Sequence, residues 1–126
     1  MSLLRYEDFS ISFGSGRRQK FAVSHLDLEI GIGERVALVG ESGSGKTLTA
    51  LAPLRLEPEG AKVTGKILWH QKDGQEAVDL LSLPIEKIRE IRGREIAMVF
   101  QEPMTALNPL FTIGNQIIEA VQIYQP

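Results

Sequence analysis

The sequence predicts an α/β fold in which an antiparallel β hairpin precedes a core of strands and helices. Three observations support this prediction: two runs with loosely alternating apolar residues lie at 3–13 and 21–30, an apolar run at 35–39 enters a glycine-rich loop, and another apolar run lies at 95–100. Alternation with a period of two is typical of strands that have one solvated face. Short continuous apolar runs are typical of strands buried inside a parallel sheet.

The first part of the chain, residues 1–34, is expected to form the hairpin. A polar turn, GSGRRQK, separates the two alternating runs, and residues 31–34 turn the chain toward the next strand. We expect that strand and a following helix at 35–56, and Pro53 limits how far the helix extends. An antiparallel β subdomain therefore precedes a strand that leads into a helix.

The glycine-rich loop at 40–47 reads GESGSGKT and matches the complete GxxxxGK[ST] pattern, known as Walker A. Glycines let the backbone curl so that successive N–H groups point at phosphates, and the helix that follows adds the positive end of its dipole. Lys46 supplies a positive charge for the β- and γ-phosphates, and the Thr47 hydroxyl can bind Mg²⁺. The predicted nucleotide-binding residues are Gly40, Glu41, Ser42, Gly43, Ser44, Gly45, Lys46 and Thr47. The pattern indicates a P-loop NTPase core, and an ordinary glycine turn is the alternative interpretation.

Strands and a short helix are expected at 57–101. The run KILWH at 66–70 is typical of a strand, and the turn KDGQ follows it. Ser82 can cap a helix whose apolar side carries the isoleucines within 85–91, and Gly93 ends that helix. This segment is therefore expected to add a strand and a short amphipathic helix.

The apolar run EIAMVF at 95–100 is expected to be a buried strand with Gln101 at its carboxyl end. In open α/β sheets, ligand contacts collect at the carboxyl ends of strands, which makes Gln101 a candidate site residue. Residues 102–126 are expected to begin a helical subdomain, because apolar residues at helical spacing predict a helix over 113–124.

Composition and charge exclude several function classes. The 126 residues carry a formal net charge of −2, which gives no reason to expect nucleic acid as a partner. The sequence has no cysteine and therefore no disulfide framework. No apolar stretch approaches the length of a membrane span, so we expect no direct membrane insertion. His25 and His70 have no second ligand at metal-binding spacing, and we interpret both as structural or surface residues.

The order of these parts resembles the first half of an ATP-binding cassette (ABC) transporter ATPase. The resemblance rests on the pair Phe13 and Gly14, the loop GESGSGKT, the segment IREIRGREIAMVF and the segment QEPMTALNPLFTIGNQI. More narrowly, the chain resembles the oligopeptide, dipeptide and nickel importer group, including the microcin C-type peptide importers. Kinases and GTPases share the phosphate loop, so the discriminating feature is the Gln-Glu-Pro element that starts at Gln101, which is followed by Leu107, Asn108 and Pro109.

The resemblance implies roles for individual residues. Phe13 would stack on the adenine of ATP, and Ser42 to Thr47 would wrap the phosphates. Thr47 and the Q-loop residue Gln101 would hold Mg²⁺, while Lys46 and Gln101 would act in catalysis, with Gln101 placing the attacking water. A neutral amide suits this role because it can accept a hydrogen bond from water or contact the metal without a charge penalty. The alternatives are that Phe13 is a core aromatic at a strand end and that Gln101 is an ordinary polar residue.

The resemblance also implies the setting in which the protein works. It would be the ATP-hydrolysing subunit of an importer for peptides or a related solute, bound peripherally at the cytoplasmic face of the inner (plasma) membrane. Its partners would be transmembrane permease subunits and a second ATPase subunit, with a solute-binding protein acting indirectly.

Several family elements are absent from the 126 residues: a signature loop of the LSGGQ type, the Walker B aspartate with its catalytic glutamate, and a switch histidine. Asp79 follows apolar residues but precedes the glutamine strand, which is the wrong order for Walker B. We therefore interpret the chain as an amino-terminal half, truncated before these elements, that lacks turnover on its own. Two alternatives remain open: an ATP-binding fragment without turnover, and another P-loop enzyme such as a small-molecule kinase.

Overall fold

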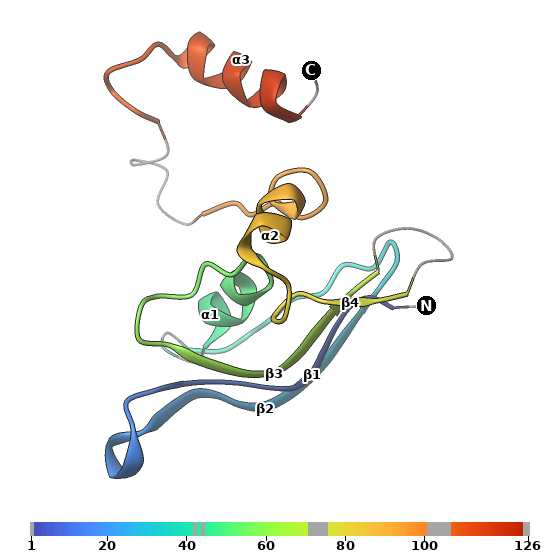
Figure 1. Ribbon diagram of the computed structural model, residues 1–126, viewed down its shortest axis with the longest axis vertical. Helices are drawn as coiled ribbons and strands as arrows, with labels where there is room; N and C mark the ends of the chain where they lie inside the picture. Colours follow the sequence, from blue (N-terminus) through green and yellow to red (C-terminus); the bar gives the residue numbers. More distant parts are fainter. Residues whose placement is uncertain (1, 42, 44, 71–75, 101–106, 125–126) are drawn as a thin grey trace. The chain divides into compact units, whose positions relative to one another are not determined.

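The computed structural model describes residues 2–41, 43, 45–70, 76–100 and 107–124. The chain forms two compact units, residues 1–89 and 90–126 (Figure 1). The first unit contains a β-sheet with short helices, whereas the second contains loops and the amphipathic helix at 113–124.

The first unit is built on a four-stranded antiparallel sheet with the order β2-β1-β3-β4. Its strands are β1 (Ser2–Phe13), β2 (Lys20–Gly31), β3 (Lys62–Trp69) and β4 (Val78–Asp79). The predicted hairpin is confirmed, since β1 pairs with β2 from Ser2↔Gly31 to Phe13↔Lys20. The strand expected at 66–70 is also present and begins earlier. Strand β4 was not predicted, because two residues carry too little pattern to be recognised.

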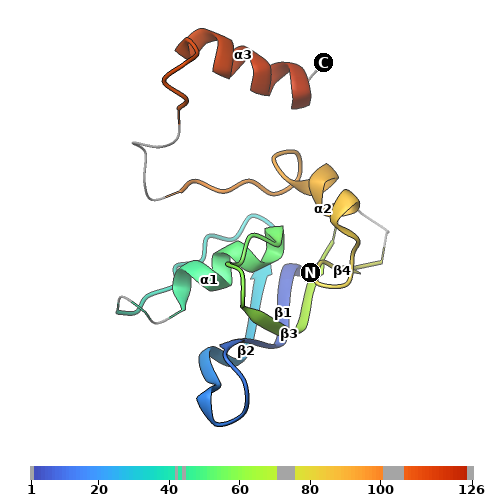
Figure 2. The same cartoon turned by 60° about the vertical axis from the view of Figure 1, so that its left-hand side comes forward.

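Helix α1 (Lys46–Leu51) is followed by a 3₁₀ turn, η2 (Ala52–Leu54), so the helix ends just before Pro53 as predicted. Figure 2 shows α1 lying over one face of the sheet. Helix α2 (Ile85–Ile91) has the predicted position, and its Ile88 is fully buried. The buried hydrophobic side chains of residues 1–89 are Tyr6, Phe9, Ile11, Ala52, Leu54, Ile67, Trp69, Leu80 and Ile88. The core of this unit therefore lies between the sheet and its helices.

A row of backbone irregularities crosses three neighbouring strands. Asp8 on β1, His25 on β2 and Gly65 on β3 all have positive φ angles, of 47°, 52° and 95°. The strand registers shift at this row, as expected for β-bulges, which bend strands and increase their twist. A Cβ atom on Gly65 would lie 2.3 Å from the Asp8 carbonyl oxygen, so only glycine fits. The His25 Nδ1 and Asp8 Oδ1 atoms lie 2.5 Å apart across the row.

Two predicted strands are not formed. Residues 34–41 contain no strand, and neither do residues 97–100, where the sequence predicted buried core strands. Val39 is 94% exposed and Val99 is 97% exposed. A parallel strand obtains its backbone hydrogen bonds from neighbouring strands. Within the described ranges the only parallel pairing is the isolated bridge between Arg92 and Ile96, so these apolar runs have no adjacent strand to pair with.

The second unit contains the predicted helix, α3 (Ile113–Tyr124). Thr112 caps it, because its Oγ1 accepts a hydrogen bond from the Asn115 N–H at 3.1 Å. Gln116 fixes the preceding loop: its Nε2 donates to the carbonyls of Asn108 and Phe111, and its Oε1 accepts from the Asn108 N–H. The large apolar side chains of this helix are exposed.

Candidate phosphate-binding site

The phosphate loop needs glycine at two of its described positions. Gly43 and Gly45 have φ angles of 85° and 89°, in the left-handed region that favours glycine. A Cβ atom on Gly45 would lie 2.6 Å from the Val23 Cγ2 atom and 2.7 Å from the Ala22 carbonyl oxygen. The last glycine of the loop therefore packs directly on strand β2, which fixes where helix α1 begins.

Lys46 is the first residue of α1, and its side chain folds back over the loop. Its ammonium group donates a hydrogen bond to the carbonyl of Gly40, the first residue of the loop. This contact places the positive charge beside the backbone of Gly40. The Thr47 side chain is exposed, so its hydroxyl is accessible to a ligand. The two side chains that the sequence assigned to phosphate and Mg²⁺ thus both start the same helix.

Phe13 lies on the same hairpin that supports the loop. It ends β1, pairs with Lys20 and is half-buried. Lys20 is three residues along β2 from Val23, which contacts Gly45, so the two points lie about 10 Å apart along the strand. Gly14, which follows Phe13, has a φ of 80°, and a Cβ atom there would lie 2.6 Å from the Arg18 carbonyl oxygen. The turn geometry therefore explains the glycine of this pair.

Of the remaining predicted site residues, Glu41 is exposed and three are not placed. Ser42, Ser44 and Gln101 lie outside the described residues, and the strand expected to deliver Gln101 is not formed. The structure therefore brings together the hairpin, the described loop glycines and Lys46, while the role of Gln101 stays a prediction.

Tyr6 and Thr49 are two buried polar residues that the sequence did not assign to the site. The Tyr6 hydroxyl donates to the Thr49 carbonyl at 2.7 Å. The Thr49 Oγ1 donates to the Gly45 carbonyl at 2.8 Å, and the Thr49 N–H donates to the same oxygen at 2.9 Å. Burial raises the pKa of the Tyr6 hydroxyl, which keeps it protonated and able to donate. The alternating pattern marked Tyr6 only as a strand residue.

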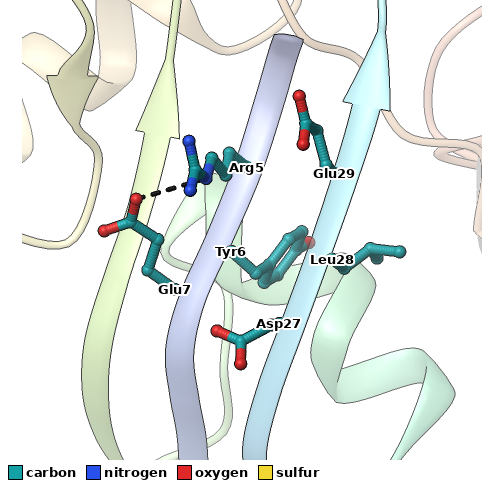
Figure 3. Close-up of a pocket in the computed structure, with 6 residues that line it drawn as sticks. All are labelled: Arg5, Tyr6, Glu7, Asp27, Leu28 and Glu29. Atoms are coloured by element: carbon teal, nitrogen blue, oxygen red, sulfur yellow. Dashed lines mark ion pairs between the residues drawn. The ribbon is translucent and has the colours of Figure 1, made fainter.

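A shallow pocket on strands β1 and β2 has the wrong charge for phosphate. Figure 3 shows its lining: Arg5, Tyr6, Glu7, Asp27, Leu28 and Glu29. Its one arginine is paired with Glu7, at 3.2 Å between Nε and Oε1. Two further carboxylates remain, and they would repel an anion. The charge of this pocket therefore does not suit a phosphate group.

In the described part of the chain, no group of three or more His, Cys, Asp or Glu residues is arranged to hold a metal ion. None of the helices in the described ranges combines the length and apolar character needed to cross a membrane.

An antiparallel β subdomain that supports a Walker A loop and its helix defines the amino-terminal part of a P-loop ATPase domain. The sequence profile described as ABC transporter matches residues 23–125, and the chain belongs to this family. ATPase domains of the family bind ATP, generally with Mg²⁺.

Curated relatives are similar over nearly the whole chain. The Peptidoglycan transport ATP-binding protein YejF of Agrobacterium fabrum is 46% identical over 98% of this chain, which covers 22% of that protein. The Glutathione import ATP-binding protein GsiA of Escherichia coli K12 is 41% identical over 98% of the chain and 20% of its own length. A Brucella abortus protein provisionally named a peptide import ATP-binding protein is 45% identical over 98% of the chain and 37% of its own length. The chain thus spans between a fifth and somewhat over a third of the relatives it matches.

Proposed function

We propose that this chain is the amino-terminal part of the ATP-binding subunit of an ABC importer. The subunit would couple ATP binding and hydrolysis to the import of a peptide or a related solute. The observation that carries this proposal is the complete GESGSGKT loop, whose Gly45 packs on β2 and whose Lys46 reaches back over the turn. The names of the relatives, which refer to peptidoglycan, glutathione and peptide transport, support the class of solute.

The loop and the first turn of α1 would bind the triphosphate. Gly43 and Gly45 adopt the backbone conformation that lets N–H groups turn inward, and Lys46 would exchange the Gly40 carbonyl for phosphate oxygens. The Thr47 hydroxyl would contact Mg²⁺, which when bound offsets the negative charge of the phosphates. These groups hold and orient the nucleotide, and they keep its charge compensated.

Two further residues complete the proposed site. Phe13 would stack on the adenine from the end of the hairpin next to its turn, and its half-buried ring at the end of β1 supports this role. Gln101 would orient the attacking water and contact the metal. The assignment of Gln101 rests on the family resemblance of the sequence around it.

The proposed setting is the cytoplasmic face of the inner membrane, with peripheral attachment. Permease subunits would receive the conformational change, a second ATPase subunit would complete the nucleotide site, and a solute-binding protein would act indirectly. The family membership supports a permease partner and dimerisation.

The test is a calorimetric titration of the 126-residue chain with Mg-ATP. We expect saturable binding that Lys46→Ala weakens by at least about tenfold, because a charge-assisted hydrogen bond to phosphate is lost. Lys66→Ala is the matched control, since it removes an exposed lysine from β3 and leaves the loop intact. Equal affinity in wild type and Lys46→Ala would contradict the proposal, as would no binding by a chain whose NMR spectrum shows that it is folded.

A further inference from the structure

Helix α1 contains one backbone acceptor that the helix cannot satisfy by itself. In an α-helix, the Thr49 carbonyl would accept a hydrogen bond from the N–H four residues later. That position is Pro53, which has no N–H. Two other carbonyls of the helix are satisfied locally, because the Leu48 carbonyl accepts from the Ala52 N–H and the Leu51 carbonyl accepts from the Leu56 N–H. The gap therefore falls on Thr49 alone among these carbonyls.

The Tyr6 hydroxyl fills this gap from strand β1. It donates to the Thr49 carbonyl at 2.7 Å, and both residues are only 4% exposed. Without this donor, the carbonyl would be a buried acceptor with no access to water, which is costly. The Tyr6 ring also contacts Phe9 edge to face, at 5.1 Å between ring centroids. Because the ring is held by packing, the hydroxyl meets the helix in a fixed position.

The same residue of the helix is bonded to the phosphate loop. Thr49 donates twice to the Gly45 carbonyl, through its N–H and its Oγ1. Gly45 in turn packs against Val23 and Ala22 on β2. A continuous buried path thus connects the Tyr6 hydroxyl, through Thr49, with the last glycine of the loop.

We propose that Tyr6 is a positioning residue of the phosphate loop. By replacing the N–H that Pro53 lacks, its hydroxyl holds helix α1, and with it Gly45 and Lys46, in register with the sheet. The effect on nucleotide binding rests on the function proposed above, whereas the effect on the helix does not. The proposal gives Tyr6 no contact with the nucleotide.

The first experiment measures amide hydrogen exchange of the 126-residue chain without nucleotide. Tyr6→Phe keeps the ring and removes the donor, so exchange within α1 should become about fivefold faster, the usual effect of one neutral hydrogen bond. Pro53→Ala introduces an N–H that can bind the Thr49 carbonyl. Adding Pro53→Ala to Tyr6→Phe should therefore return α1 exchange to within about twofold of wild type. If the two substitutions acted independently, their effects on α1 exchange would instead add in the double variant.

The matched control is Tyr124→Phe, which removes the same atom from the other tyrosine of the sequence and should leave α1 exchange unchanged. Three results would overturn the proposal: unchanged α1 exchange in Tyr6→Phe, an equal acceleration throughout β3 and α1, or failure of Pro53→Ala to reverse the effect. For each variant, the change in exchange relative to wild type is compared between α1 and β3, which separates local opening of α1 from global unfolding.

The second experiment titrates the same four proteins, wild type, both single variants and the double variant, with Mg-ATP. Tyr6→Phe should weaken binding by about fivefold, and Pro53→Ala should restore it. Local acceleration of exchange with unchanged affinity would overturn the link between Tyr6 and the phosphate loop. If wild type does not bind, the proposed function fails for this chain, and the exchange cycle still decides whether the Tyr6 hydroxyl holds α1.

Discussion

The two units of the chain use apolar residues in opposite ways. In residues 1–89, Phe9, Ile11 and Ile67 are fully buried between the sheet and its helices. In residues 90–126, α3 also carries apolar residues at regular helical spacing, yet Ile117 and Val121 are more than half exposed. Both patterns produced the expected secondary structure. The difference teaches that periodicity determines the element, whereas burial requires a second surface to pack against.

The two sides of the phosphate loop differ in the same way, since one side packs on the sheet and the other is exposed. Its carboxyl side is tied to the sheet, because Gly45 contacts β2 and Thr49 is bonded to Tyr6. Its amino side follows residues 34–39, which form no strand and expose Val39. The sheet therefore supports the carboxyl end of the loop, whereas the described contact at the amino end comes from the Lys46 side chain, which donates to the Gly40 carbonyl.

The largest expected effect tests the contrast in burial. Phe9→Ala should destabilise the chain by about 3–5 kcal/mol, because it removes a large, fully buried side chain. Ile117→Ala should change the free energy of unfolding by less than about 0.5 kcal/mol, since that side chain is 58% exposed. Urea denaturation followed by circular dichroism measures both values. Equal losses would mean that the α3 face is buried in solution.

A smaller effect separates the two loop glycines. Gly45→Ala should cost at least about 2 kcal/mol, because the new Cβ meets a strained φ and also overlaps with β2. Gly43→Ala has a similar φ, but its Cβ would meet nothing within 4 Å, so only the strain of about 1–2 kcal/mol remains. Thermal unfolding of the two variants checks the order. A larger loss for Gly43→Ala would show that contact with β2 does not define the end of the loop.

The smallest effect concerns alkaline pH. Burial raises the pKa of the Tyr6 hydroxyl above its ordinary value of 10.0, so above pH 10 the unfolded chain loses this proton before the folded chain does. The stabilisation is complete below pH 10, and it decreases above that pH by up to about 1.4 kcal/mol per pH unit. Tyr6→Phe should reduce this slope, measured by urea unfolding between pH 9 and about pH 11. Tyr124→Phe should not, and an identical slope in Tyr6→Phe would contradict the assignment.

Much of the fold could be predicted from local sequence patterns. The hairpin, the strand that contains Trp69, the short helix with Ile88 and the helix at 113–124 all have periods that local residues determine. The prediction of strands at 35–39 and 95–100 was wrong, because a parallel strand depends on neighbouring strands that are distant in sequence.

In the candidate site too, local features could be predicted from the sequence and contacts between distant residues could not. The glycine pattern predicted the loop, since positive φ is a local property of Gly43 and Gly45. The contribution of Tyr6 could not be predicted, because its partner Thr49 lies 43 residues away and the bond joins a side chain to a backbone carbonyl. Only the proline at position 53 gave a local signal that α1 lacks a donor.

The row of bulges at Asp8, His25 and Gly65 has a consequence for how this sequence can change over generations. If one of the three strands were regular here, its register would no longer match that of its neighbour, because the register shifts of adjacent strands lie at the same row. Gly65 in particular is compatible only with the displaced Asp8 carbonyl beside it. The three positions should therefore covary during evolution. We expect selection against insertions at this row, and we expect accepted substitutions to occur in pairs on adjacent strands.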